Sequence, residues 1–159
     1  MITSLFLSAL SGFLAKTTDA LKTRAAYLTG IGYGAALGLV CAAEPLVAVV
    51  FLPAVAANVL ARKIDTGAHL AGLATFAAVL ALRGAAPFSA PLAALAFAAA
   101  FLDETMDLKL PYPRPLLPLA AVGASFVLRS PVPIASVLLF DAGYWVAART
   151  VTRKKRQKN

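Results

Sequence analysis

A chain of 159 residues that is 60% hydrophobic and only 14% charged, with a mean hydropathy of +0.80, lacks the composition of a soluble domain, since soluble domains carry about 25% charged residues. The formal net charge of +8 does not indicate a nucleic-acid partner, because the excess lies in a C-terminal tail without an aromatic or basic platform. The composition therefore predicts a helix bundle in lipid, and the single cysteine excludes an intramolecular disulfide.

The first element is an apolar stretch from Ile2 to Ala15, in which Ser4, Ser8 and Ser11 recur on one helical face. A helix of this length spans about 21 Å, less than the roughly 30 Å of a bilayer core. The stretch is therefore either a short crossing or a helix that lies in the membrane interface. It lacks the positive start and the cleavage site of a secretory signal, so we expect it to remain in the mature protein.

A polar patch follows at residues 16–24. Its Asp19 and Lys22 are three positions apart, and they can pair if the patch is helical. In one interpretation this pair faces lipid headgroups. In the other, Asp19 and Lys22 bind a phosphorylated substrate.

The segment from Ala25 to Ala43 is the first full-length predicted crossing. Gly30, Gly34 and Gly38 recur every four residues along it, and small residues at this spacing let the backbone of another helix approach closely. We expect a helix-packing face here, either within the chain or between the copies of a homo-oligomer. Five further crossings are predicted, at Leu46–Ala61, Leu70–Leu82, Ala85–Leu102, Leu116–Leu128 and Ile134–Ala148.

A second polar cluster lies at residues 62–69, between two predicted crossings. Asp65 is placed to cap the helix that follows, and His69 lies about one turn further along it. One helical face then offers Asp65 as a metal ligand and His69 as a general base, both in catalytic roles, with Arg62 and Lys63 binding substrate. The alternative is a helix cap and a hydrogen bond within the bundle.

Three of the seven acidic residues, Asp103, Glu104 and Asp107, lie at the end of another apolar run. Asp103 and Asp107 share one helical face and repel each other unless a cation lies between them. Mg²⁺ prefers oxygen ligands and typically joins one or two carboxylates to substrate phosphates. The cluster therefore predicts a metal site for Mg²⁺, the one cofactor we expect. The alternative is a solvated helix end that pairs with Lys109 and Arg114.

Asp141 lies inside the last predicted crossing. An ionisable group within a crossing is costly, and by default it indicates a site, a proton relay or an ion pair. We predict a catalytic role for Asp141 or a place on an ion path, with a cationic partner from residues 62–69. The alternative is a structural hydrogen bond to a neighbouring helix through Tyr33 or Asn58.

The distribution of basic residues predicts the orientation. If each of the six segments crosses once, thirteen of the fifteen Lys and Arg residues lie on one side, which the positive-inside bias identifies as cytoplasmic. We expect one transmembrane domain, residues 1–149, in the cell membrane, and a basic cytoplasmic tail, residues 150–159, on anionic lipid headgroups. The polar clusters then face the cytoplasm and predict one pocket.

Four short motifs give the chain a resemblance to a family of small, uncharacterised multi-pass integral membrane proteins of archaea. They are Lys16-Thr17-Thr18-Asp19, Lys63-Ile64-Asp65-x-x-x-His69-x-x-Gly72, Leu102-Asp103-Glu104 and Phe140-Asp141-x-Gly143-Tyr144. The resemblance implies a helical membrane protein and no particular activity. The chain resembles CDP-archaeol synthase only in size and helix-rich character, since the polar loops of that family are not matched.

The predicted fold is thus an all-α polytopic transmembrane bundle with six crossings and a short N-terminal helix as a potential seventh. Three functional hypotheses remain open, of which only the first includes an enzyme. The first is a cytoplasm-facing pocket for a divalent cation and a phosphorylated lipid or prenyl substrate. The second is an ion- or proton-coupled transporter or channel component that uses Asp141. The third is a non-catalytic assembly subunit that uses the glycine face.

Overall fold

Seven α-helices and no strand make up the part of the chain that the computed structural model describes, which is residues 1–21, 23–106 and 114–156, with residues 151–156 as backbone only. The predicted all-α class is confirmed. The helices are α1 (Ile2–Ala20), α2 (Arg24–Ala43), α3 (Pro45–Leu60), α4 (Gly67–Arg83), α5 (Ala90–Thr105), α6 (Leu116–Val127) and α7 (Val132–Arg156).

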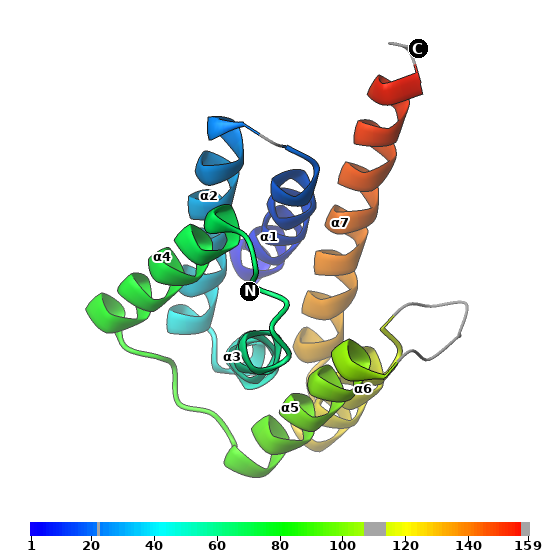
Figure 1. Cartoon of the computed structure of the whole chain (residues 1–159). Coiled ribbons are helices and arrows are strands. Elements are labelled where there is room, and N and C mark those ends of the chain that lie inside the picture. Colours follow the sequence, from blue (N-terminus) through cyan, green and yellow to red (C-terminus); the bar gives the residue numbers. More distant parts are fainter. Residues whose placement is uncertain (22, 107–113, 157–159) are drawn as a thin grey trace.

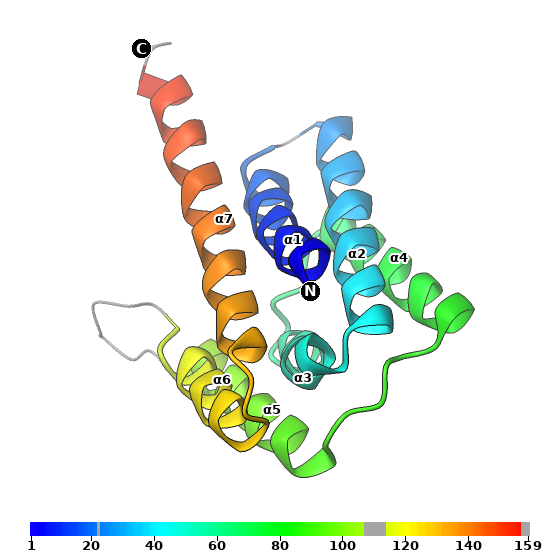
Figure 2. The same ribbon diagram turned by 180° about the vertical axis from the view of Figure 1, so that it is seen from behind.

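Helix α3 lies at the centre of the fold (Figure 1). All five residues from Val47 to Phe51 are buried in succession, and a helix that is apolar on every side is typically buried on every side. The other helices follow one another around it in the order α4, α2, α1, α7, α6 and α5, each packed against the next. The reverse view shows the same arrangement, with α7 projecting beyond the rest (Figure 2).

Two helices of the described part are long and apolar enough to cross a membrane, Arg24–Ala43 with 20 residues and the portion Val132–Thr150 of α7 with 19. Three shorter apolar helices, Pro45–Leu60, Gly67–Arg83 and Leu116–Val127, have between 10 and 17 residues. The central α3 has 16 residues and spans about 24 Å, against the roughly 30 Å of a bilayer core. The all-α fold is therefore established, whereas six crossings are not.

Glycines allow two helix pairs, α2–α4 and α1–α7, to approach with their backbones in contact. A methyl group at Gly34 would fall on the carbonyl oxygen of Gly72 in α4, and one at Gly30 would fall on that of Ala68. A methyl group at Gly12 in α1 would meet the backbone of Phe140 in α7. The glycine face of α2 thus packs against α4 of the same chain.

Replacement of Gly34 by alanine tests this close packing. We expect Gly34→Ala to lower the free energy of unfolding by about 1–3 kcal/mol, because the added methyl group forces two backbones apart. The measurement is the thermal unfolding midpoint of the detergent-solubilised protein. Gly123→Ala is the matched control, since nothing lies within 4 Å of the added methyl group. Equal midpoints for the two variants would contradict the packing.

Candidate functional site

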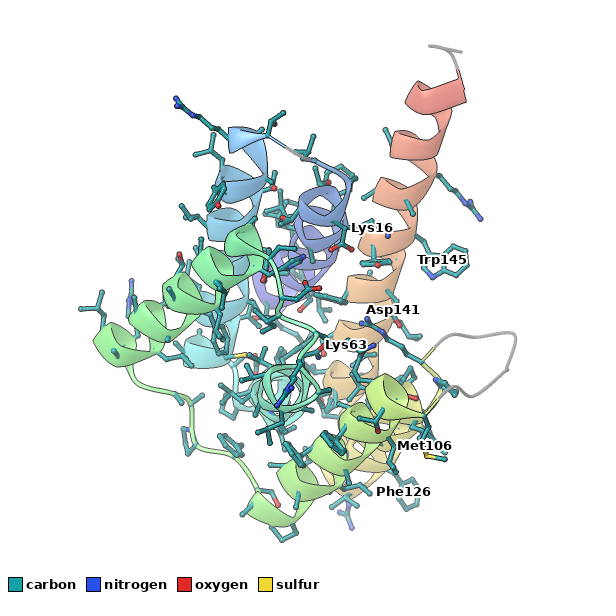
Figure 3. All side chains as sticks on the ribbon, in the orientation of Figure 1. Lys16, Lys63, Met106, Phe126, Asp141 and Trp145 are labelled. Atoms are coloured by element: carbon teal, nitrogen blue, oxygen red, sulfur yellow. The ribbon has the colours of Figure 1, made fainter. Side chains whose placement is uncertain are left out.

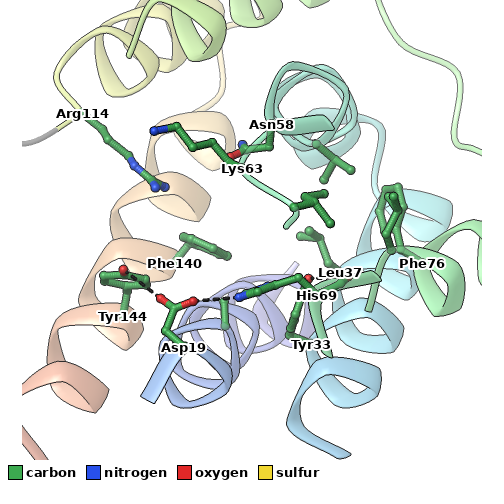
Figure 4. Close-up of a pocket in the computed structure, with 14 residues that line it drawn as sticks. Asp19, Tyr33, Leu37, Asn58, Lys63, His69, Phe76, Arg114, Phe140 and Tyr144 are labelled. Carbon is green, nitrogen blue, oxygen red and sulfur yellow. Dashed lines mark hydrogen bonds and ion pairs between the residues drawn. The ribbon is translucent and has the colours of Figure 1, made fainter. Parts of the chain in front are cut away.

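A polar network joins four helices at one end of the bundle. We use this name for Lys16 and Asp19 of α1, Tyr33 of α2, His69 of α4 and Tyr144 of α7, and Figure 4 shows all of them except Lys16. The Asp19 carboxylate lies 2.7 Å from His69 Nε2 through Oδ1 and accepts a hydrogen bond of 3.2 Å from the Tyr144 hydroxyl through Oδ2. Lys16 Nζ donates to the Tyr144 hydroxyl at 3.1 Å and also lies 3.7 Å from Asp19 Oδ2. Asp19 is therefore the common partner of residues from three helices, α1, α4 and α7.

Local structure fixes the position of His69. The side chain of Thr66 accepts the His69 backbone N–H at 3.3 Å and so caps the start of α4. The expectation that Asp65 caps this helix is therefore wrong, because Thr66 does so. Asp65 is exposed and lies outside the network. Tyr33 reaches His69 because Gly72 leaves room for its ring; a methyl group at Gly72 would lie 2.6 Å from it.

The network keeps Asp19 and Lys16 charged. Partial burial acts to raise the pKa of the Asp19 carboxyl, but the hydrogen bond and charge of His69, with Lys16 and Tyr144, lower it below its ordinary value of 3.8. Burial likewise acts to lower the pKa of the Lys16 ammonium, but Tyr144 and Asp19 raise it above 10.5. The two groups therefore form an ion pair, with Lys16 Nζ 3.7 Å from Asp19 Oδ2.

A second group of charges lies across from the network. The side chain of Glu104 in α5 is only 7% exposed, and its carboxylate pairs with Arg114 Nη2 at 3.0 Å and Lys63 Nζ at 3.8 Å. Lys63 follows a tight helix end in which its N–H bonds the carbonyl of Asn58 and the preceding N–H bonds that of Val59. This turn places Arg62 at φ 55°, with its side chain exposed.

Asp103 has a structural partner. Its two carboxylate oxygens accept the backbone N–H groups of Leu116 at 3.0 Å and Leu117 at 2.7 Å, so it stabilises the start of α6. In the described part of the chain, no three His, Cys, Asp or Glu side chains lie close enough to hold a metal ion. Asp107, the third predicted ligand, lies outside the described residues, as does Lys22.

A cavity of about 180 Å³, here called the pocket, lies between the Asp19–His69 pair of the polar network and the two cations Lys63 and Arg114 (Figure 4). Its polar side is formed by Asp19, Tyr33, His69 and Tyr144 of the network together with Asn58, Lys63 and Arg114. Its apolar side is formed mainly by Leu37, Val55, Leu73, Phe76 and Phe140. The pocket thus presents charged groups and hydrocarbon to the same space.

Asp141 does not line the pocket itself. It lines two neighbouring cavities, of about 280 Å³ and 90 Å³. Arg114 and Phe140 line all three cavities, so Asp141 is next to the pocket. The larger neighbour is also lined by Lys16, which lies between α1 and α7, and by Trp145, which projects from the outer side of α7 (Figure 3).

The structure therefore brings three of the predicted site residues, Asp19, Lys63 and His69, to one pocket. Glu104 contacts this group through its ion pair with Lys63. Sequence reasoning missed the roles of Tyr33 and Tyr144, whereas the alternative pairing of the acidic cluster with Arg114 is confirmed for Glu104. Tyr144 follows Asp141 by three positions and shares its helical face, which is a usable signal. Tyr33 lies between the glycines of α2 and carries no such signal, because its contact with His69 spans 36 residues.

Comparisons of the chain with protein-family models, with curated protein sequences and with solved structures find no match. The functional interpretation therefore depends on the geometry of the pocket.

The lowered pKa of Asp19 predicts a pH dependence of stability. Because this pKa is lower in the folded than in the unfolded protein, the stabilisation is complete above 3.8 and is lost as the pH falls below that value. We expect Asp19→Asn to be less stable than the wild type near neutral pH and to approach it as the pH falls through the lowered pKa of the folded protein. Thermal midpoints across this range check the prediction, with the exposed Asp65→Asn as control. A constant difference would contradict it.

Asp103→Asn separates a structural from a metal-binding role. The amide has one acceptor oxygen, so one of the two α6 N–H groups loses its partner, at a cost of about 1–2 kcal/mol. We expect a lower thermal midpoint without any added cation. An unchanged midpoint combined with loss of Mg²⁺ binding by calorimetry would instead support the predicted metal site. Asp65→Asn is again the matched control.

Proposed function

We propose that this chain is a multi-pass integral membrane protein of the cell membrane whose pocket binds the anionic headgroup of a phosphorylated lipid or prenyl compound. The observation that carries the proposal is the pocket itself, where Lys63 and Arg114 face the same space as an apolar wall. The C-terminus is cytoplasmic in this proposal, in keeping with the basic tail.

Exposed apolar side chains support the membrane part of the proposal. Large hydrophobic residues are exposed on several helices, among them Ile2 at 82%, Leu82 at 86% and Phe126 at 86%. Phe126 and Met106 project from the outer side of the bundle near α5 and α6 (Figure 3). Soluble monomers rarely expose extensive apolar surface, whereas a lipid environment accommodates it. Helices α2 and α7 supply two segments long enough to cross.

The charges of the pocket support an anionic ligand. The side chains of Lys63 and Arg114 are 50% and 44% exposed, so both retain donors beyond their contact with Glu104. An arginine fork binds phosphate oxygens in a bidentate manner, and lysine adds a point charge. Leu37, Leu73 and Phe76 then offer contacts to the start of a hydrocarbon chain.

A divalent cation belongs to this proposal only together with the ligand. The carboxylate of Asp103 already accepts two backbone N–H groups of α6. Glu104 is already paired with the side chains of Lys63 and Arg114. Mg²⁺ commonly enters a site bound to phosphate and keeps several of its waters, so the ligand would supply most of its oxygens. The calorimetry described below is therefore carried out with and without Mg²⁺.

The transport hypothesis remains a second candidate because Asp141 lines two cavities beside the pocket. It predicts uptake that depends on Asp141 and on an ion or proton gradient. The assembly hypothesis has less support, because the glycine face that it would use is covered by α4.

Calorimetric titration of the detergent-purified protein tests headgroup binding. The probes are phosphatidic acid and farnesyl phosphate, which distinguish the two ligand sources, with farnesol as the uncharged reference. The test variant combines Lys63→Gln, Arg114→Gln and Glu104→Gln so that no buried charge is left unpaired. We expect its affinity to fall at least about tenfold, since charged hydrogen bonds contribute about 1.5–3 kcal/mol each.

Two controls make this result interpretable. Glu104→Gln alone keeps both cations and is expected to bind at least as tightly as the wild type. Arg83→Gln removes an exposed cation from the far end of α4 and is expected to change nothing. Equal binding of farnesol and farnesyl phosphate, or full affinity in the triple variant, would overturn the proposal.

A further inference from the structure

Both ring nitrogens of His69 are engaged inside the protein. Nε2 lies 2.7 Å from the Asp19 carboxylate, which only accepts hydrogen bonds, so Nε2 carries a proton. Nδ1 lies 3.2 Å from the Tyr33 hydroxyl. Neither nitrogen is therefore directed at the ligand space as a free base.

The Tyr33 hydroxyl has two acceptors within reach. It lies 3.2 Å from His69 Nδ1 and 3.3 Å from the backbone carbonyl oxygen of the same residue. A hydroxyl carries one proton and donates to one of these at a time, but its oxygen also accepts. The position of Tyr33 thus satisfies two different states of the ring.

In the neutral state, Nε2–H donates to Asp19 and Tyr33 donates its proton to Nδ1. In the charged state, a proton from water occupies Nδ1 and Nδ1–H donates to the Tyr33 oxygen. The Tyr33 hydroxyl then rotates and donates to the His69 carbonyl oxygen. No covalent bond of Tyr33 changes, and no buried polar atom loses its partner in either state.

We propose that His69 takes up one proton when an anionic ligand enters the pocket, and that Tyr33 is the two-position hydrogen-bond partner that permits it. This inference rests on the proposed headgroup binding. The added positive charge appears where the polar network lines the pocket, across from Lys63 and Arg114 (Figure 4). Binding then strengthens as the pH falls.

The proton is assigned to His69 because its neighbours Asp19 and Lys16 keep their charges. Asp19 is held ionised by its partners, and Lys16 is held protonated. Histidine is the side chain whose charge ordinarily changes between about pH 5 and 8. The other titratable or charged groups that line the pocket are Tyr33, Tyr144, Lys63 and Arg114, and Tyr27, Arg62 and Asp65 lie near the start of α4.

The chain contains one histidine, so nitrogen NMR of a protein without a histidine tag reports on His69 alone. For the free wild-type protein at about pH 8, we expect the neutral ring to be protonated at Nε2, with a hydrogen-bonded Nδ1. Tyr33→Phe is expected to shift the Nδ1 resonance toward that of a free nitrogen. A ring protonated at Nδ1 in the wild type would overturn the assignment.

Calorimetry in two buffers of different ionisation enthalpy then counts the protons taken up with the phosphorylated probe that binds more tightly. The phosphate group of the probe has a second pKa of about 6 and exchanges protons itself, so His69→Gln provides the baseline. At about pH 7 we expect the wild type to take up more protons for each bound ligand than His69→Gln, and Tyr33→Phe to show a smaller excess. Ligand binding with the same number of exchanged protons in the wild type and in His69→Gln would overturn this inference alone. Absence of binding to the wild type at every pH would overturn the proposed function as well.

Discussion

The pocket depends on how closely two pairs of helices approach. Glycines at the contacts between α2 and α4 and between α1 and α7 carry no side chain that would hold the helices apart. The two backbones therefore touch in each pair. This contact brings the His69 ring within reach of Tyr33 and the Asp19 carboxylate within reach of Tyr144. Residues with larger side chains at these crossings would separate the helices by more than a hydrogen bond can bridge. The close packing of the helix backbones thus determines which polar side chains can form hydrogen bonds with one another.

Asp19 is the link between the two helix pairs. Its carboxylate contacts His69 of α4 on one side and Tyr144 of α7 on the other, and each contact compensates for the partial burial of its charge. Glu104 performs a similar task across the pocket with Lys63 and Arg114. The pocket is therefore lined by the paired carboxylate of Asp19 and by the two partly exposed cations, Lys63 and Arg114, that pair with Glu104.

The helical fold and the polar ends of the helices could be predicted from the sequence, because long apolar runs and clustered charges indicate both. The number of crossings could not, since several helices end before they reach bilayer length. For Asp103, the four-residue spacing to Asp107 suggested a shared cation, whereas its partners are amides 13 and 14 positions further along. Pairings over such separations follow from tertiary packing, which no local pattern contains.

The pairing of α1 with α7 also determines when the pocket is complete. Asp19 and Tyr144 are separated by 125 residues, and synthesis proceeds from the N-terminus. Of the seven described helices, α1 is made before the others and α7, against which it packs, is made after them. Helix α1 therefore has no final neighbour on that side until all the other described helices exist. The hydroxyls of its buried Ser8 and Ser11 donate hydrogen bonds to backbone carbonyl oxygens of α1 itself. They therefore have hydrogen-bond partners before α7 is present. A shortened chain that lacks α7 would lose Phe140 and Tyr144 from the lining of the pocket, and with them the second hydrogen-bond partner of Asp19.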